Sequence, residues 1–67
     1  MKLSARNVLT GTVISVEVGH VTSHVKIDIG GAIVTAAITN EAVADLGLKE
    51  GDRASAIIKA SDVIIGV

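Results

Sequence analysis

Apolar and polar residues alternate along much of this chain, a pattern typical of strands in a half-buried sheet. Residues 8–18 are rich in β-branched side chains and predict a first strand. Every second residue of it would share one face: Val8, Thr10, Thr12, Ile14, Val16 and Val18. Residues 21–29 alternate more cleanly and predict a second strand. Its apolar face would carry Val21, Ser23, Val25, Ile27 and Ile29.

Glycines punctuate this pattern. Gly19 and His20 mark the turn between the first two strands, and Gly30-Gly31 predicts a tight hairpin turn with positive φ angles. Residues 32–39 then form a third strand, expected to be more buried because it has little polar face.

The period changes to a helical one at Thr39-Asn40. Either residue can cap a helix, Ala42, Val43 and Leu46 recur at helical spacing, and Gly47 ends the helix. A turn over residues 48–52 leads into a fourth strand, 53–60, and a break at Ser61-Asp62 precedes a fifth apolar strand. The fold class is therefore all-β, a five-stranded OB-like barrel with one short helix between strands three and four, in a single domain of residues 1–67.

Size and composition favour an oligomer. A chain of 67 residues buries only about 60% of its unfolded surface, so a lone monomer is marginally stable. There is no cysteine to provide a disulfide, while 49% of the residues are hydrophobic and none is aromatic. Small aliphatic side chains of this kind suit close contacts between sheets.

The charge balance argues against several classes of partner. The net charge is −1, with six basic and seven acidic residues, so there is neither a basic face nor an aromatic platform for nucleic acid. No apolar run is long enough to span a membrane, and no signal-peptide pattern opens the chain, so a cytoplasmic protein is expected.

Catalytic and metal chemistry find little support. No phosphate-loop, Gly-x-Ser-x-Gly or Ser-x-x-Lys pattern occurs, and two histidines alone make a poor metal cage. The acidic residues are scattered, and His20 and His24 are read as solvent-facing or interface side chains. We therefore expect no enzyme activity, no cofactor and no directly bound metal cation.

Two basic residues stand out. Arg6 lies between Ser4 and Asn7, and Lys59 ends a strand just before Ala60 and Ser61, where backbone amides should be free. A cation beside a hydroxyl suits an oxyanion. Spacing alone does not show that the two cations meet, and solvated strand-end residues remain the alternative. The start of the short helix, near Thr39, is a third possible donor set.

Several sequence motifs, spread over essentially the whole chain, resemble those of a known family. The segment Ser4-Ala5-Arg6-Asn7, the helix start Ile38-Thr39 and the closing Lys59-Ala60-Ser61-Asp62-Val63 are similar to the molbindins. These are small cytoplasmic proteins that bind molybdate or tungstate.

The resemblance implies a homo-hexamer, a trimer of dimers, with oxyanion pockets between subunits. One subunit would supply Ser4, Arg6, Lys59, Ala60 and Ser61. Its partner would supply Thr39 and Ala42. Some relatives have a serine where this chain has Ala42, so only the backbone amide of Ala42 could contribute. A second class of pocket, near the threefold axis, would be lined by Gly19, His20, Val21 and Thr22.

The resulting prediction is storage or buffering of molybdate or tungstate without turnover. Two alternatives remain open. The chain could be an oligomeric assembly or regulatory module without oxyanion binding, or an OB-type nucleic-acid binder, which the charge and the missing aromatic residues argue against.

Overall fold

A four-stranded antiparallel sheet forms most of this protein, for which the computed structural model describes residues 1–67. The elements follow the order β1 (Asn7–Val18), β2 (Thr22–Asp28), β3 (Ile33–Thr39), α1 (Asn40–Leu46) and β4 (Arg53–Ile58), and a 3-10 helix, η1 (Ala60–Asp62), comes last. In space the strands lie in the order β3-β2-β1-β4.

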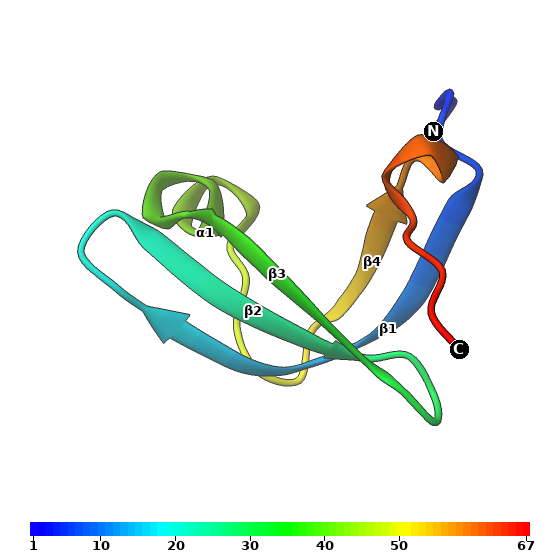
Figure 1. The fold of residues 1–67 in the computed structure, drawn as a ribbon. Helices are drawn as coiled ribbons and strands as arrows, with labels where there is room; N and C mark the ends of the chain where they lie inside the picture. Colours follow the sequence, from blue (N-terminus) through cyan, green and yellow to red (C-terminus); the bar gives the residue numbers. More distant parts are fainter.

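The sheet curls into a half-barrel, with α1 at one end and both chain termini at the other (Figure 1). Gly30 and Gly31, with φ angles of 89° and 94°, form the predicted turn between β2 and β3. The helix begins and ends as predicted, capped by the Thr39 hydroxyl and terminated by Gly47 in the left-handed conformation. No helix has the length and apolar character needed to cross a bilayer.

The prediction that every second residue from Val8 to Val18 shares one face of β1 is partly wrong, because the strand contains a bulge. Val13 pairs with Ile27, but the next pair is Ser15 with Lys26, so Ile14 is an extra residue without a partner. The first half of β1 therefore turns Leu9, Gly11 and Val13 inward, while Val8 and Thr10 face outward. After the bulge Val16 packs against the core, as the predicted face of that half requires.

Gly11 allows the sheet to curl at this point. It is buried, and a side chain there would meet backbone: an added Cβ would lie 2.0 Å from the carbonyl oxygen of Asp28 and 2.9 Å from Cα of Ile29. Only a residue without Cβ permits this approach between β1 and the end of β2. The glycine therefore sets the curvature of the half-barrel.

The core of a single chain is small. Val13, Val25 and Ile27 are the buried hydrophobic residues, with Val43 from α1 and Leu48 packed partly against them. The apolar face predicted for β2 is confirmed for Ser23, Val25 and Ile27, which are buried, whereas Val21 precedes the strand and is 70% exposed.

β3 is less buried than expected. It forms one edge of the sheet, and Ile33 is 57% exposed while Val34, Ala36 and Ile38 are only half-buried. The lack of a polar face on β3 therefore does not mean that the strand is central in the sheet. It means that apolar surface of this edge strand is open to solvent.

The fifth strand is absent from the single chain, and the prediction of a fifth strand is wrong at this level. β4 ends at Ile58 rather than at residue 60, because the chain turns into η1. Residues 63–67 pair with no strand of the sheet, and Ile64 and Ile65 are 92% and 83% exposed. The half-barrel is consequently left open between β3 and β4, its two edge strands.

Candidate functional site

The ladder between β1 and β4 brings the two candidate cations to the same end of the sheet. Its last pair joins Asn7 with Ile58, so Arg6 and Lys59 follow at matching positions immediately beyond it. Both residues are exposed. Neither side chain takes part in a hydrogen bond within the chain. Like charges at opposing positions repel, so this end of the sheet favours an anion between them.

A turn of η1 follows Lys59 directly. Lys59 is extended, with φ −63° and ψ 139°, and the amide of Asp62 donates to its carbonyl at 2.9 Å. Ala60 and Ser61 are exposed in this turn, where the first amides of a helix have no acceptor within the helix itself. The Asp62 carboxylate belongs to the same turn, so the positive charge here is partly offset.

Ser4 lies on the same side of the molecule. It occupies a bend two residues before Arg6, in the exposed segment that precedes β1. The structure therefore collects Ser4, Arg6, Lys59, Ala60 and Ser61 at the ends of one pair of strands, next to the N-terminus (Figure 1).

Thr39 and Ala42 lie at the opposite end of the sheet. Thr39 pairs with Thr22 at the far end of β3. Its Oγ1 accepts the amide hydrogen of Ala42 at 3.0 Å, so that amide is already engaged within the chain. The hydroxyl group of Thr39 keeps its own hydrogen free to donate.

No single chain can combine the two groups of residues. β1 runs between the two groups and has 12 residues, which would span roughly 36 Å in a straight strand. The strand is curled, because the longest dimension of the chain is 32 Å, but it still separates the two groups by most of the length of the molecule (Figure 1). Arg6 precedes the first residue of β1, and Thr39 lies beside the hairpin that follows the last. A pocket that contains both must therefore be built from two chains.

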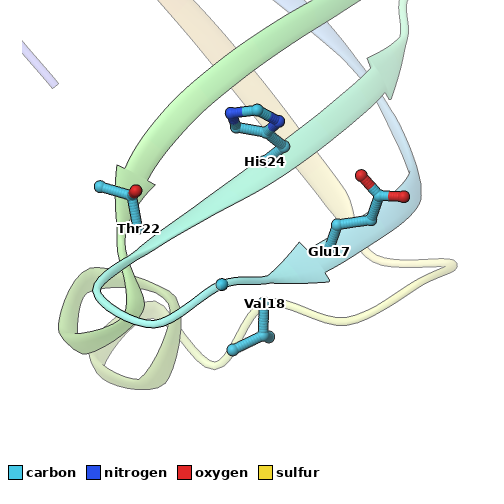
Figure 2. Close-up of a pocket in the computed structure, with 5 residues that line it drawn as sticks. Glu17, Val18, Thr22 and His24 are labelled. Carbon is cyan, nitrogen blue, oxygen red and sulfur yellow. The ribbon is translucent and has the colours of Figure 1, made fainter.

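The hairpin between β1 and β2 borders an open hollow. It is lined by Glu17, Val18, Gly19, Thr22 and His24. Glu17 and His24 are paired across the two strands and lie on one side of the hairpin, whereas Val18 points to the other side (Figure 2). Of the residues expected in a second pocket, Gly19 and Thr22 line this hollow, and His20 and Val21 do not.

Glu17 and His24 are the residues that the sequence reasoning missed here. The sequence could have indicated that these two residues lie opposite each other, because strands joined by a turn over Gly19–Val21 pair residue 17 with residue 24. The carboxylate of Glu17 makes the hollow of one chain a less favourable place for a dianion than the Arg6 end of the sheet.

The hairpin is fastened to the start of α1. Asn40 donates its backbone amide to the Val21 carbonyl at 2.7 Å and its side-chain amide to the Gly19 carbonyl at 2.9 Å. Its Oδ1 accepts a hydrogen bond from Ser23, which is fully buried. The Gly19–Thr22 turn and the residue next to Thr39 therefore form one rigid unit.

The inner surface of the half-barrel is an apolar groove. Its cavity measures about 360 Å³, and eleven of its thirteen lining residues are hydrophobic, contributed by β2, β3, β4, Leu46 and Leu48. No group of three or more His, Asp or Glu side chains is arranged to hold a metal ion.

Comparison with known proteins identifies the family of the chain. A family model described as the TOBE domain matches residues 3–65. A probable molybdenum-pterin-binding protein of Haemophilus influenzae is 48% identical over 68 residues, which cover 100% of this chain and 99% of the relative. The resemblance to molbindins drawn from the sequence is confirmed.

Two solved structures are similar over the whole chain. One is the cytoplasmic molybdate-binding protein ModG with molybdate bound, at 54% identity and a TM-score of 0.95; this chain spans 48% of the ModG chain. The other is a molybdate-binding protein from Sporomusa ovata, at 39% identity and a TM-score of 0.94, with 100% of both chains covered.

Proposed function

The chain belongs to the TOBE domain family, and from that premise we propose that it binds molybdate or tungstate in the cytoplasm and stores or buffers it without turnover. Its relatives support the ligand: ModG holds molybdate in its crystal structure, and the Sporomusa ovata protein is a molybdate-binding protein. The cytoplasmic location has support from the description of ModG.

One observation carries the proposal: Arg6 and Lys59 follow at matching positions beyond the last pair of the β1–β4 ladder. Two exposed cations at the same end of the sheet supply +2, of which the Asp62 carboxylate offsets part, against the −2 of a tetrahedral dianion. A guanidinium fork and an ammonium group can bind two or more of the oxygens of the dianion. The hydroxyls of Ser4, two residues before Arg6, and of Ser61, two residues after Lys59, are further donors in the same two segments.

The energetics allow such a site without a metal-ligand bond. Hydrogen bonds to charged groups contribute about 1.5 to 3 kcal/mol each. Five or six of them leave the ~8 kcal/mol of a micromolar site after the costs of desolvation and ordering.

Selectivity follows from a lining of donors. Monohydrogenphosphate carries a proton that needs an acceptor, which the cations and backbone amides cannot provide, and a hydroxyl that donates to one oxygen of the anion is not directed to accept a hydrogen from another. Sulfate has no such proton and is discriminated only by size, because a pocket fitted to the longer metal–oxygen bonds holds the smaller ion loosely. Molybdate and tungstate, nearly equal in size and charge, are both ligands of this pocket.

The complete pocket requires assembly. We propose a homo-hexamer, a trimer of dimers as in the molbindins, in which the Thr39 hydroxyl of one chain approaches Arg6 of another. This arrangement is supported by the positions of the two residues at opposite ends of the sheet. Because Ala42 already donates its amide to Thr39, the hydroxyl of Thr39 is the donor that the partner contributes.

Assembly also accounts for the fifth strand. The open groove and the exposed tail of residues 63–67 are both apolar, so we propose that the tail completes the barrel in the oligomer. The turn over Gly19, His20, Val21 and Thr22 would form the second class of pocket, where three copies meet around the threefold axis. Its affinity would be lower because of Glu17.

A titration of paired variants tests the function. Arg6→Ala should lower molybdate affinity at least tenfold, because it removes a charge-assisted fork. His24→Ala, which removes an exposed ring at the other end of the sheet, should leave the affinity at the Arg6 pocket unchanged. Equal binding by parent and Arg6→Ala would contradict the site. An oligomer that binds no oxyanion at all would identify the chain as an assembly module instead.

A further inference from the structure

We propose that Asn7 is a positioning residue of the oxyanion pocket: it holds the strand end that carries Arg6 against the strand end that carries Lys59. Asn7 would not touch the anion. Its effect would pass through the spacing of the two cations, so this inference rests on the proposed function of that pocket.

The contact lies at the last point where the two strands are joined. The side-chain amide of Asn7 donates to the carbonyl oxygen of Ile58 at 3.1 Å, and these two residues are also the final pair of the ladder. Beyond them the ladder stops, and the side chains of Arg6 and Lys59 make no hydrogen bonds that would hold the two strand ends together. Asn7 is half-buried, which shields its bond from water.

This bond opposes a repulsion. Arg6 and Lys59 are like charges at matching positions, and such pairs push strand ends apart. Without the side-chain bond of Asn7, only the backbone pairing of Asn7 with Ile58 would oppose the repulsion, and the spacing of the two cations would widen. A dianion that bridges both cations would then have to draw the ends together again, at the expense of its affinity.

The bond also orients the backbone on which Lys59 and the η1 turn are built. The chain has no cis peptide bonds, so the carbonyl of Ile58 and the amide of Lys59 point in opposite directions. Because the carbonyl is directed to Asn7 on β1, the amide of Lys59 points away from β1. The orientation of this peptide plane also fixes the direction in which the extended backbone of Lys59 leads into Ala60 and Ser61.

The protein contains a matched control on the same two strands. Thr10 and Ser55 are a ladder pair whose hydroxyl groups are 2.8 Å apart, three residues farther from the strand ends. Thr10→Val removes one side-chain hydrogen bond between β1 and β4, as Asn7→Leu does. Only Asn7→Leu removes it next to the two cations.

The experiment measures, for the parent and each variant, the dissociation constant for molybdate and the concentration of sulfate that displaces it. Thermal unfolding without anion and the mass in solution are measured on the same samples. Asn7→Leu should bind molybdate roughly fivefold to tenfold more weakly, and sulfate should compete better relative to molybdate because the looser pocket no longer favours the larger ion. Thr10→Val should keep both values within about twofold of the parent.

A residue that only stabilises the fold would lower the unfolding temperature and leave the ratio of sulfate to molybdate affinity unchanged. Asn7→Gln, which retains a carboxamide donor, should recover part of the loss in molybdate affinity and selectivity. If Asn7→Leu does not fold, Asn7→Ala serves in its place, since it leaves Ile58 without the same donor.

The outcomes separate the two proposals. A parent that binds no molybdate refutes the proposed function, and the role of Asn7 falls with it. A parent that binds, together with an Asn7→Leu variant of equal affinity and selectivity, overturns the role of Asn7 alone. The same conclusion follows if Thr10→Val loses as much affinity as Asn7→Leu.

Discussion

Replacing Gly11 with alanine tests the packing that curls the sheet. The new Cβ would lie 2.0 Å from the carbonyl oxygen of Asp28, where ordinary contacts begin near 3.4 Å, and the obstructing atoms are backbone. β1 and the end of β2 would have to separate by more than about 1 Å, although neighbouring strands lie only about 4.8 Å apart. The Thr12–Asp28 pair and the Val13–Ile27 core contact are next to the clash.

The cost follows from what this separation breaks. Two ladder hydrogen bonds contribute about 0.5 to 1.5 kcal/mol each, and a loosened core contact adds about 1 kcal/mol more. The free energy of unfolding should fall by about 3 kcal/mol. A 67-residue domain has about 3 to 10 kcal/mol in total, so the variant should be close to unfolding or unfolded.

Chemical denaturation of Gly11→Ala and Gly66→Ala provides the measurement. In the single chain Gly66 has no atom within 4 Å of an added Cβ, so its replacement should change the free energy of unfolding by less than about 0.5 kcal/mol as long as the measured mass shows that assembly is unchanged. Circular dichroism would follow unfolding, with the mass determined at each protein concentration. A Gly11→Ala protein as stable as Gly66→Ala would refute this account of the curl.

Four further perturbations have definite expected outcomes. Deleting residues 64–67 removes exposed apolar side chains and should yield a smaller assembly by light scattering; an unchanged mass would refute their role in assembly. Thr39→Val should weaken molybdate binding roughly tenfold in a titration, whereas Thr39→Ser should not. Arg6→Met should raise the melting temperature of the anion-free protein at low salt, since it relieves the repulsion with Lys59, and equal melting would contradict that repulsion. Val13→Ala, at a site 1% exposed, should cost about 2 kcal/mol in denaturation, and a loss below about 0.5 kcal/mol would contradict its core position.

Local patterns predicted the regular elements well. The clean alternation of β2 marked Val25 and Ile27 as core, and the capping residue Thr39 with Gly47 bounded α1. These predictions succeeded because each depends on residues that are neighbours in sequence.

Features that depend on distant partners were harder to predict. The bulge at Ile14 changes the face of β1 and leaves no mark in the alternation itself. β3 has little polar face although it lies at a sheet edge, and the pattern of one chain cannot distinguish such a strand from a central one. The tail after η1 has a strand-like composition, but the single chain gives it no strand to pair with.

The parts of the proposed site are far apart in the sequence, and the strand register relates two of them. Sequence identified Arg6 and Lys59 separately, 53 residues apart, and the Asn7–Ile58 pair put them at matching positions. The Ala42 amide, the group that the resemblance offers to the anion, donates to Thr39 Oγ1 in the single chain. Glu17 and His24 emerged only when the hairpin was paired.

Isothermal titration of the purified protein with molybdate tests the central claim most directly. The titration is repeated with tungstate, sulfate and phosphate at physiological ionic strength, and the mass is measured by light scattering on the same sample. The account predicts micromolar or tighter binding of molybdate and tungstate by an oligomer, with at most weak binding of sulfate and phosphate. An intact oligomer that gives no heat with molybdate or tungstate would contradict it.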